Sequence, residues 1–428
     1  MAIKIFKGVS STVMTYAARV RSFRPNARLY LINVLVTGAA MGIFRLLFNF
    51  YVLSLGYNEA LLGQLVTTSS LAALIFALPM GYLADLIGRK SSLILSGALM
   101  SLSLTAMVIW PNATVFYLTN ILFGISQSLA AVTMAPFLME NSGEEERTYL
   151  FSIGSGLQMT AASIGNWIGG FLPTWVAASR VVEATSSVAY GGALTITAVT
   201  AALGLLPLLF LKTPRIERSD RTVFAPLAYA ASHPRKLGRL ILPMLLTSIG
   251  AGLIMPFMNV FYRQVYNQPD PVIGSLFAWG SLAMAIGLLV APPLADRMGK
   301  IQMVVITQGI SIPFLVLLGF SPWFWLSAFA YYIRLALMNM SGPVYQTFVM
   351  ENVEPSARST VASLVSMSWN FGWAFSPMIS GWFQVTYGFG PAYLGTILLY
   401  SLSVYLYWAY FWRSPVQMQK EGFQASAD

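Results

Sequence analysis

The feature that most constrains this chain is a series of long apolar runs separated by short polar links. An α-helix needs about 20 predominantly apolar residues to cross a bilayer, and twelve runs of about that length can be delimited. They cover residues 29–54, 61–83, 91–110, 113–139, 149–174, 187–211, 240–262, 272–294, 301–321, 323–350, 359–386 and 391–412. Such continuous runs are too long for membrane barrels, whose alternating strands have about 10 residues. The sequence therefore predicts an all-α polytopic membrane protein with twelve transmembrane helices.

Composition excludes a soluble enzyme. Only 9% of the residues are charged and 57% are hydrophobic, whereas soluble domains carry about 25% charged residues. The absence of cysteine rules out disulfide frameworks, thiolate metal sites and cysteine nucleophiles. The net charge of +10 is distributed in short patches between apolar runs, which is typical of membrane proteins. We therefore expect no enzymatic activity, no cofactor, no metal site and no nucleic-acid partner.

The distribution of Lys and Arg predicts the orientation. With the N-terminus inside, most of the 25 basic residues fall in cytoplasmic links, as the positive-inside rule requires. We therefore expect an inner or plasma membrane location with both termini in the cytoplasm. The predicted segments are a basic cytoplasmic segment (1–28), a first six-helix bundle (29–211), a cytoplasmic linker (212–239), a second six-helix bundle (240–412) and a cytoplasmic tail (413–428).

The two halves of the chain repeat each other at a constant offset of 211 residues. Leu83-Ala84-Asp85 recurs as Leu294-Ala295-Asp296, Gly88-Arg89 as Gly299-Lys300, Met139-Glu140-Asn141 as Met350-Glu351-Asn352, Arg147 as Arg358, Gly63 as Gly274 and Gly170 as Gly381. Because six spans is an even number, the halves have the same orientation, and we expect two pseudo-symmetric six-helix bundles. Parallel repeats of this kind build transporters whose substrate site lies near the membrane midplane.

The links after spans 2 and 8 carry the most specific motif. Gly81-Tyr-Leu-Ala-Asp85-Leu-Ile-Gly88-Arg89-Lys90 resembles the G-x-L-a-D-r-x-G-R-r loop of the major facilitator superfamily. Pro292-Pro-Leu-Ala-Asp296-Arg297-Met-Gly299-Lys300 is a weaker copy, and Glu140 with Arg147, like Glu351 with Arg358, resembles the acid-and-arginine pairs after spans 4 and 10. The resemblance covers all twelve spans and implies a carrier that works by alternating access. We expect a monomer.

The resemblance also implies a role for the duplicated loops. Gly88 permits a tight turn, Asp85 can accept hydrogen bonds from backbone N–H groups or an arginine, and Arg89 and Lys90 face the cytoplasm and anionic headgroups. The cluster is expected to latch the outward-facing state by packing on a helix of the other half. The latch residues are Gly81, Asp85, Gly88, Arg89, Glu140, Arg147, Asp296, Gly299, Glu351 and Arg358. A plain topogenic loop is the alternative, and for Asp296 the two hypotheses weigh equally.

Only two ionisable residues, Arg45 and Arg334, lie well inside the spans, and no acid lies mid-span. A charge inside the bilayer is costly and marks a functional site by default. A guanidinium matches the geometry of carboxylate or phosphate, so a substrate anion could neutralise both arginines. The alternatives are that Arg45 extends outward to the membrane surface and that Arg334 bonds backbone carbonyls.

Polar and aromatic residues of other spans complete the candidate substrate site, since the resemblance implies that spans 1, 4, 7 and 10 line a central cavity. These candidates are Asn49, Asn120, Gln127, Asn259, Tyr331, Trp369 and Trp373. Ordinary packing is the alternative for each aromatic residue. Many proton-linked family members carry Arg where Asn120 stands, and no carboxylate lies mid-span. Standard proton coupling is therefore not expected.

Span 5 contains Gly165-Asn166-Trp167-Ile168-Gly169-Gly170, which resembles the G-P-x-x-G-G antiporter signature with Asn166 in place of Pro. This favours export, and a small-residue packing face is the equal alternative.

We therefore expect a secondary transporter for a small organic solute with an anionic group, resembling the drug and organic-solute exporter branch. Its partners are the solute and membrane lipid, with a coupling ion or an exchanged solute left open. A broad-specificity drug efflux antiporter is the alternative, and a non-carrying membrane receptor or lipid scramblase on the same fold is a third.

Overall fold

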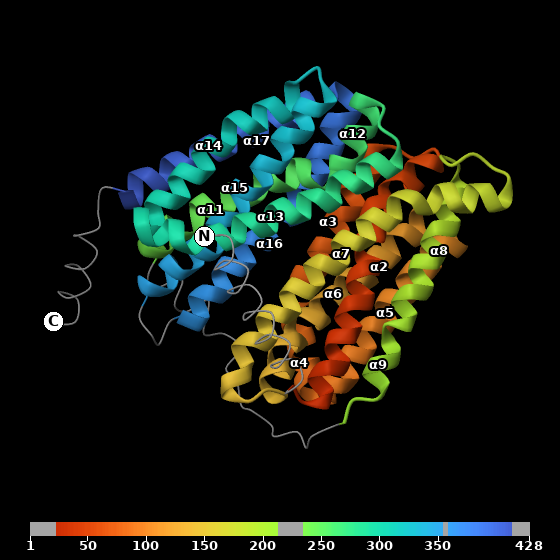
Figure 1. Ribbon diagram of the computed structural model, residues 1–428, viewed down its shortest axis with the longest axis horizontal. Coiled ribbons are helices and arrows are strands. Elements are labelled where there is room, and N and C mark those ends of the chain that lie inside the picture. Colours follow the sequence, from red (N-terminus) through yellow and green to blue (C-terminus); the bar gives the residue numbers. More distant parts are fainter. Residues whose placement is uncertain (1–22, 213–233, 354–357, 413–428) are drawn as a thin grey trace, which may run out of the picture. The chain divides into compact units, whose positions relative to one another are not determined.

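The computed structural model describes residues 23–212, 234–353 and 358–412 (Figure 1). Every regular element in these residues is a helix. Most of the predicted N-terminal segment and linker, and the whole of the predicted tail at 413–428, lie outside the described residues. The same holds for the side chains of Arg147 and Arg358, which belong to helices whose backbone is described.

Nine membrane spans are recognisable from length and apolar composition within the described residues. Eight are straight or gently bent, and a ninth is the pair α3 (Glu59–Ile75) and α4 (Ala77–Ile87), which is bent by 54°. The eight are α2 (Pro25–Ser54), α5 (Arg89–Ile109), α6 (Ala113–Glu140), α8 and α9 (Ser187–Leu203, Leu205–Leu209), α11 with η1 and α12 (Pro234–Ile254, Met255–Phe257, Met258–Tyr266), α13 (Asp270–Met298), α14 (Lys300–Phe320) and α17 with η3 (Gly390–Tyr407, Trp408–Trp412).

Three further long helices account for the remaining predicted runs. They are α7 (Glu144–Arg180), α15 (Phe324–Glu351) and α16 (Arg358–Tyr387), with 37, 28 and 30 residues. At a rise of about 1.5 Å per residue, each exceeds the hydrocarbon thickness of about 30 Å. Each of the twelve predicted runs therefore falls on one long helix or one broken helix, and the all-α polytopic fold is confirmed.

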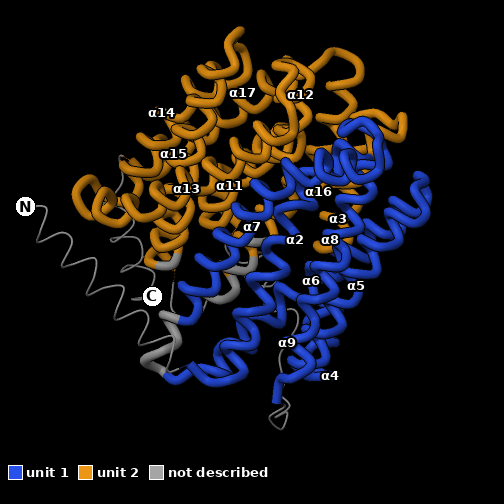
Figure 2. Tube along the Cα trace, turned by 45° about the vertical axis from the view of Figure 1, so that its right-hand side comes forward, with its two compact units in different colours: residues 1–51, 75–220 blue, residues 52–74, 221–428 orange. Residues whose placement is uncertain are grey.

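The chain divides into two compact units (Figure 2). Unit 1 comprises residues 1–51 and 75–220, and unit 2 comprises residues 52–74 and 221–428. Residues 52–74, which hold most of α3, thus group with the helices of the second half of the chain. The repeat predicted from the sequence assigns the same residues to the first six-helix bundle.

Two glycines explain why α3 packs so closely on α16 within unit 2. A Cβ atom on Gly63 would collide with the carbonyl group of Pro377, and one on Gly381 would collide with the carbonyl oxygen of Glu59. The Thr67 hydroxyl also accepts a hydrogen bond from the Met378 amide at 3.2 Å. Close backbone approach at small residues is the usual way in which helices associate in membranes.

Small residues also bring α2 and α7 together in unit 1. A Cβ atom on Gly42 would collide with the carbonyl oxygen of Ala162, and one on Gly165 would collide with that of Ala39. Gly165 begins the segment that resembles an antiporter signature. The packing alternative is therefore sufficient to explain this glycine.

Candidate functional site

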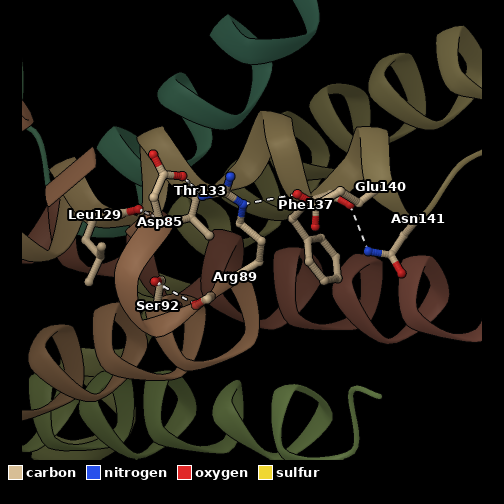
Figure 3. A network of polar contacts seen from close by, with 9 residues as sticks. Asp85, Arg89, Ser92, Leu129, Thr133, Phe137, Glu140 and Asn141 are labelled. Carbon is tan, nitrogen blue, oxygen red and sulfur yellow. Dashed lines mark hydrogen bonds and ion pairs between the residues drawn. The ribbon is translucent and has the colours of Figure 1, made fainter. Parts of the chain in front are cut away.

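The loop between α4 and α5 forms an ionic network within unit 1. The Nη1 atom of Arg89 lies 2.6 Å from Oδ1 of Asp85, and its Nε atom lies 3.2 Å from Oε1 of Glu140 at the end of α6. Figure 3 shows Arg89 between the two acids. One guanidinium thus joins α4, α5 and α6. The partner of Asp85 is an arginine, one of the two kinds of partner expected from the sequence.

Glycine determines the geometry of this turn. Gly88 separates α4 from α5 with φ 84° and ψ 160°, and Gly299 separates α13 from α14 with φ 89° and ψ 149°. This region of backbone conformation is essentially restricted to glycine. The turn at Gly88 reverses the chain between Asp85 and Arg89, so their side chains meet. Gly81, by contrast, faces open space, since a Cβ atom there would meet nothing within 4 Å.

The second copy of the loop retains part of this network in unit 2. Lys300 pairs with Glu351, which repeats the pairing of Arg89 with Glu140. Asp296 is exposed, and the described residues place no ion pair on it. Both copies therefore keep an ion pair between the basic residue after the glycine and the glutamate at the end of the neighbouring helix. Among the described residues, only the aspartate of the first copy, Asp85, also forms an ion pair.

The helix-end asparagines also repeat. The Nδ2 atom of Asn141 donates to the carbonyl oxygen of Phe137 at 2.9 Å, and Asn352 donates to that of Phe348 at 2.8 Å. Each bond satisfies one of the last carbonyls of a helix, α6 or α15, which otherwise lack intrahelical partners.

Lys90 contacts the backbone at the end of α9. Its Nζ atom donates to the carbonyl oxygens of Leu209 and Leu211 at 2.9 and 2.7 Å. A cation at the C-terminal end of α9 donates to carbonyl oxygens that have no partner within the helix, and it complements the helix dipole. The sequence does not reveal this contact, because Lys90 is 119 and 121 residues away from its two partners.

The candidate substrate residues of unit 1 lie on α2 and α6. Arg45 is exposed, although Leu46 and Leu47 next to it are fully buried. The Nε2 atom of Gln127 lies 3.9 Å from the Met41 sulfur, one turn before Arg45 on α2. The structure thus places Gln127 near the helical face that carries Arg45.

The two candidate asparagines of unit 1 are both buried. Asn120 is 4% exposed, and its Nδ2 atom donates to the carbonyl oxygen of Phe116 in its own helix at 2.8 Å. Asn49 is 5% exposed on α2. Aromatic rings join the same two helices, since Phe44 packs on Phe123 with a centroid distance of 5.3 Å.

Arg334 lies fully buried inside unit 2. Its Nη2 atom donates to the Tyr400 hydroxyl of α17 at 3.2 Å, and its Cζ atom lies 5.4 Å from the centre of the Tyr400 ring. Its Nε and Nη1 atoms have no hydrogen-bond partner among the described residues. Tyr400 was not predicted as a partner of Arg334, because nothing in the sequence distinguishes it from the many other tyrosines.

Tyrosines form the surroundings of this arginine. Tyr331 precedes Arg334 by three residues on α15 and is 7% exposed. Its ring packs on Tyr262 of α12 with a centroid distance of 6.1 Å, and on Phe277 of α13 at 5.9 Å. A guanidinium over an aromatic face gains cation–π stabilisation, which is largest where water is excluded.

The other candidates of unit 2 lie on α12 and α16. Asn259 is 2% exposed, and its side-chain oxygen accepts the Val260 amide at 3.0 Å. The Trp369 carbonyl oxygen accepts a hydrogen bond from Ser248 of α11, and the buried Nε1 atom of Trp373 has no partner among the described residues. The structure therefore brings Tyr331 and Arg334 together, with Trp369 and Trp373 on a different helix.

The described residues contain no group of three or more side chains of the metal-binding types. They define an α-helical membrane protein of two repeated halves, each with a glycine-turned ionic loop. The family model described as Major Facilitator Superfamily matches residues 30–239 and again 240–427. The chain belongs to the major facilitator superfamily of membrane transporters, as its resemblance indicated.

Individual relatives are distant. The MFS-type transporter YhjO of Bacillus subtilis (strain 168) is 22% identical over 384 residues, which are 87% of this chain and 87% of that protein. Multidrug resistance protein MdtG of Proteus mirabilis (strain HI4320) is 22% identical over 94% of this chain and 99% of its own length. The solved structure of the nucleoside transporter NupG matches with a TM-score of 0.73 and 15% identity over 90% of this chain and 98% of that one.

Proposed function

We propose that this protein is a secondary transporter that moves a small organic solute with an anionic group by alternating access, with both termini in the cytoplasm. The observation that supports this function is the pair of mid-helix arginines, Arg45 and Arg334. Neither forms an ion pair with a described acid.

Burial makes the charge of Arg334 costly. A buried charge is stabilised by a paired charge with good hydrogen-bond geometry, and otherwise carries a desolvation penalty of several kcal/mol. Tyr400 supplies one neutral hydrogen bond and a ring face. Two N–H-bearing atoms of the guanidinium remain without partners in the described residues. A carboxylate or phosphate would supply both the missing charge and the missing acceptors.

Accessibility assigns different roles to the two arginines. Arg45 is exposed by surface area on α2, between buried neighbours. Arg334 is 0% exposed, so an anion reaches it only when side chains around α15 and α17 move. In this proposal the anion reaches Arg334 only during the transport cycle.

A thermal-shift screen of the purified protein identifies the ligand class. Organic anions, neutral sugars, lipids and cationic drugs are compared, because a ligand that binds only the folded state stabilises it by RT ln(1 + [L]/Kd). Stabilisation confined to anions supports the proposal. Stabilisation by cationic drugs alone contradicts it.

Arg334→Ala then tests the anion site directly. Removing one member of a buried charge pair costs about 3–5 kcal/mol, so the affinity for the anion found in the screen is expected to fall by at least about a hundredfold. Arg334→Lys is expected to recover only part of this loss, since an ammonium lacks the planar fork. Affinity is measured by calorimetry, and the unfolding temperature is measured on the same preparations.

The control for this experiment is Tyr400→Phe, which keeps the ring but removes the hydroxyl that accepts from Arg334. A purely structural role predicts that Arg334→Ala lowers the unfolding temperature while the surviving protein binds the anion normally. A folded Arg334→Ala protein with unchanged affinity contradicts the anion site.

A broad-specificity drug efflux antiporter is the second candidate. The MdtG relative favours it, and so do the large exposed rings along α16. Phe371, Phe375 and Trp382 are 48%, 41% and 53% exposed. If the protein is such an antiporter, the Arg334→Ala and Arg45→Ala variants are both expected to keep transporting several unrelated cationic drugs.

A further inference from the structure

The first half of the chain carries a set of contacts at its linker-proximal end. Asn26, in the first turn of α2, hydrogen-bonds both backbone groups of Lys212. Its Oδ1 atom accepts the Lys212 amide at 3.0 Å, and its Nδ2 atom donates to the Lys212 carbonyl oxygen at 2.9 Å. Lys212 is the last described residue before residues 213–233, which join the two halves.

The same asparagine reaches a third helix. Its Nδ2 atom also donates to Oδ1 of Asn141, the C-cap of α6, at 2.9 Å. Both donors and one acceptor of the Asn26 amide are thereby used. Lys90, at the start of α5, binds the carbonyl oxygens of Leu209 and Leu211. Residues 209–212 are therefore held by side chains from α2 and α5, and through Asn141 by α6.

These contacts are adjacent in the chain to the ionic network. Lys90 follows Arg89, and Asn141 follows Glu140. A relative shift of α5 and α6 that separates Arg89 from Glu140 therefore moves Lys90 and Asn141 as well. Hydrogen bonds weaken steeply beyond about 3.2 Å, so the contacts to residues 209–212 do not survive such a shift intact.

The internal repeat supplies a comparison. The ionic pair and the helix-end asparagine recur in the second half, but at the same offset of 211 residues Leu237 and Ile301 stand in place of Asn26 and Lys90. Both are buried, at 5% and 4% exposed, in an apolar cluster of unit 2. Among the described residues, apolar side chains therefore stand at these two positions of the second half in place of the anchoring side chains.

We infer that Asn26 and Lys90 are positioning residues of the transport cycle, which hold the start of the linker on the helix ends that carry the Asp85–Arg89–Glu140 network. The linker start and the network then change state together. This inference rests on the proposed alternating-access cycle, but it is independent of the anionic substrate.

The test uses a spin label at residue 212. The chain contains no cysteine, so Lys212→Cys creates a single labelling site and leaves the backbone hydrogen bonds in place. Asn26→Leu, which copies the residue at the offset of 211, is expected to raise the ratio of mobile to immobile label by a factor of about 5–150, the net worth of its two hydrogen bonds to Lys212. Lys90→Met is also expected to raise the ratio of mobile to immobile label, and Lys90→Arg is expected to raise it by a smaller factor.

The coupling between the ionic network and the start of the linker is tested with a substitution in the network that does not touch residues 209–212. Asp85→Asn weakens the network and is expected to raise the mobility of the label at residue 212. The matched control Asp296→Asn alters the second copy of the loop and is expected to leave it unchanged. Lys236→Met, which removes an exposed lysine of α11, controls for net charge.

A second measurement reports the transport conformations without any substrate. Spin labels at Met139→Cys and Met298→Cys, both exposed in the last turns of α6 and α13, give the distribution of distances between the two halves in liposomes. Asn26→Leu is expected to shift this distribution in the same direction as Asp85→Asn. The double variant is expected to shift it no further than the larger single change, because coupled sites are non-additive.

Three results would overturn the inference. The first is an unchanged label at residue 212 in a folded Asn26→Leu protein. The second is a mobile label in Asn26→Leu with no response to Asp85→Asn, which would make the contact merely structural. The third is additive distance shifts. Failure of the anion screen affects none of these measurements, so the inference and the proposed substrate class fail separately.

Discussion

The two copies of the loop cluster have the same backbone but different side-chain networks. Gly88 and Gly299 adopt nearly the same positive φ, and each is followed by a basic residue that reaches the acid at the end of the neighbouring helix. In the first copy the basic residue also binds Asp85, whereas no described ion pair involves Asp296. Repetition of a sequence thus preserved the turn more strictly than the charges around it.

The difference follows from one substitution between the copies. Arg89 has a planar fork of five N–H donors and can join two carboxylates, whereas Lys300 carries a compact ammonium that acts as a point charge. We therefore expect the loop of unit 1 to hold its helices together more firmly than the loop of unit 2.

Replacing the glycines is expected to have the largest effect, and the same effect in both copies. Gly88→Ala and Gly299→Ala each place a Cβ atom on a backbone conformation that costs about 1–3 kcal/mol for other residues. The unfolding temperature in detergent measures this loss. If only one of the two substitutions lowered the unfolding temperature, the two glycine turns would not be equivalent, which would contradict the view that both copies share one backbone geometry.

Truncating the basic residues is expected to separate the copies. Arg89→Ala removes two ion pairs and Lys300→Ala removes one, and partly exposed pairs contribute about 0.2–1 kcal/mol each. The distribution of distances between labels at residues 139 and 298 should therefore change about twice as much, in free energy, for Arg89→Ala. Equal changes would show that the second acid contributes nothing.

Replacing the aspartates is expected to have the smallest effect, and to affect the first copy of the loop only. Asp85→Asn removes one ion pair, worth about 0.2–1 kcal/mol, and is expected to slow solute exchange in proteoliposomes while the unfolding temperature stays the same. Asp296→Asn is expected to change neither quantity. An equal loss of exchange in both variants would mean that Asp296 acquires a partner in another state of the cycle.

Sequence patterns were sufficient for the elements and the turns of the site. The glycine turn and the repeat of Glu140 as Glu351 were predicted, because they rest on local spacing and on the offset of 211 residues, and an arginine was one of two partners expected for Asp85. The contacts of Lys90 and Tyr400 were not predicted. Tyr400 lies 66 residues from Arg334 in the chain, and no local pattern marks such a pair.

The sequence by itself determined the membrane class, the twelve helical runs, the duplication and the family, because hydrophobic length and repeated motifs are properties of the chain read in order. Only the tertiary structure decided that Arg334 is enclosed by tyrosines while Arg45 is exposed, and that Lys90 and Asn26 hold residues 209–212. The physical reason is that burial and hydrogen bonding depend on which helix faces meet. In a chain where nearly every helix is apolar on all sides, hydrophobic periodicity does not specify those faces, and close packing of small residues and individual polar contacts do.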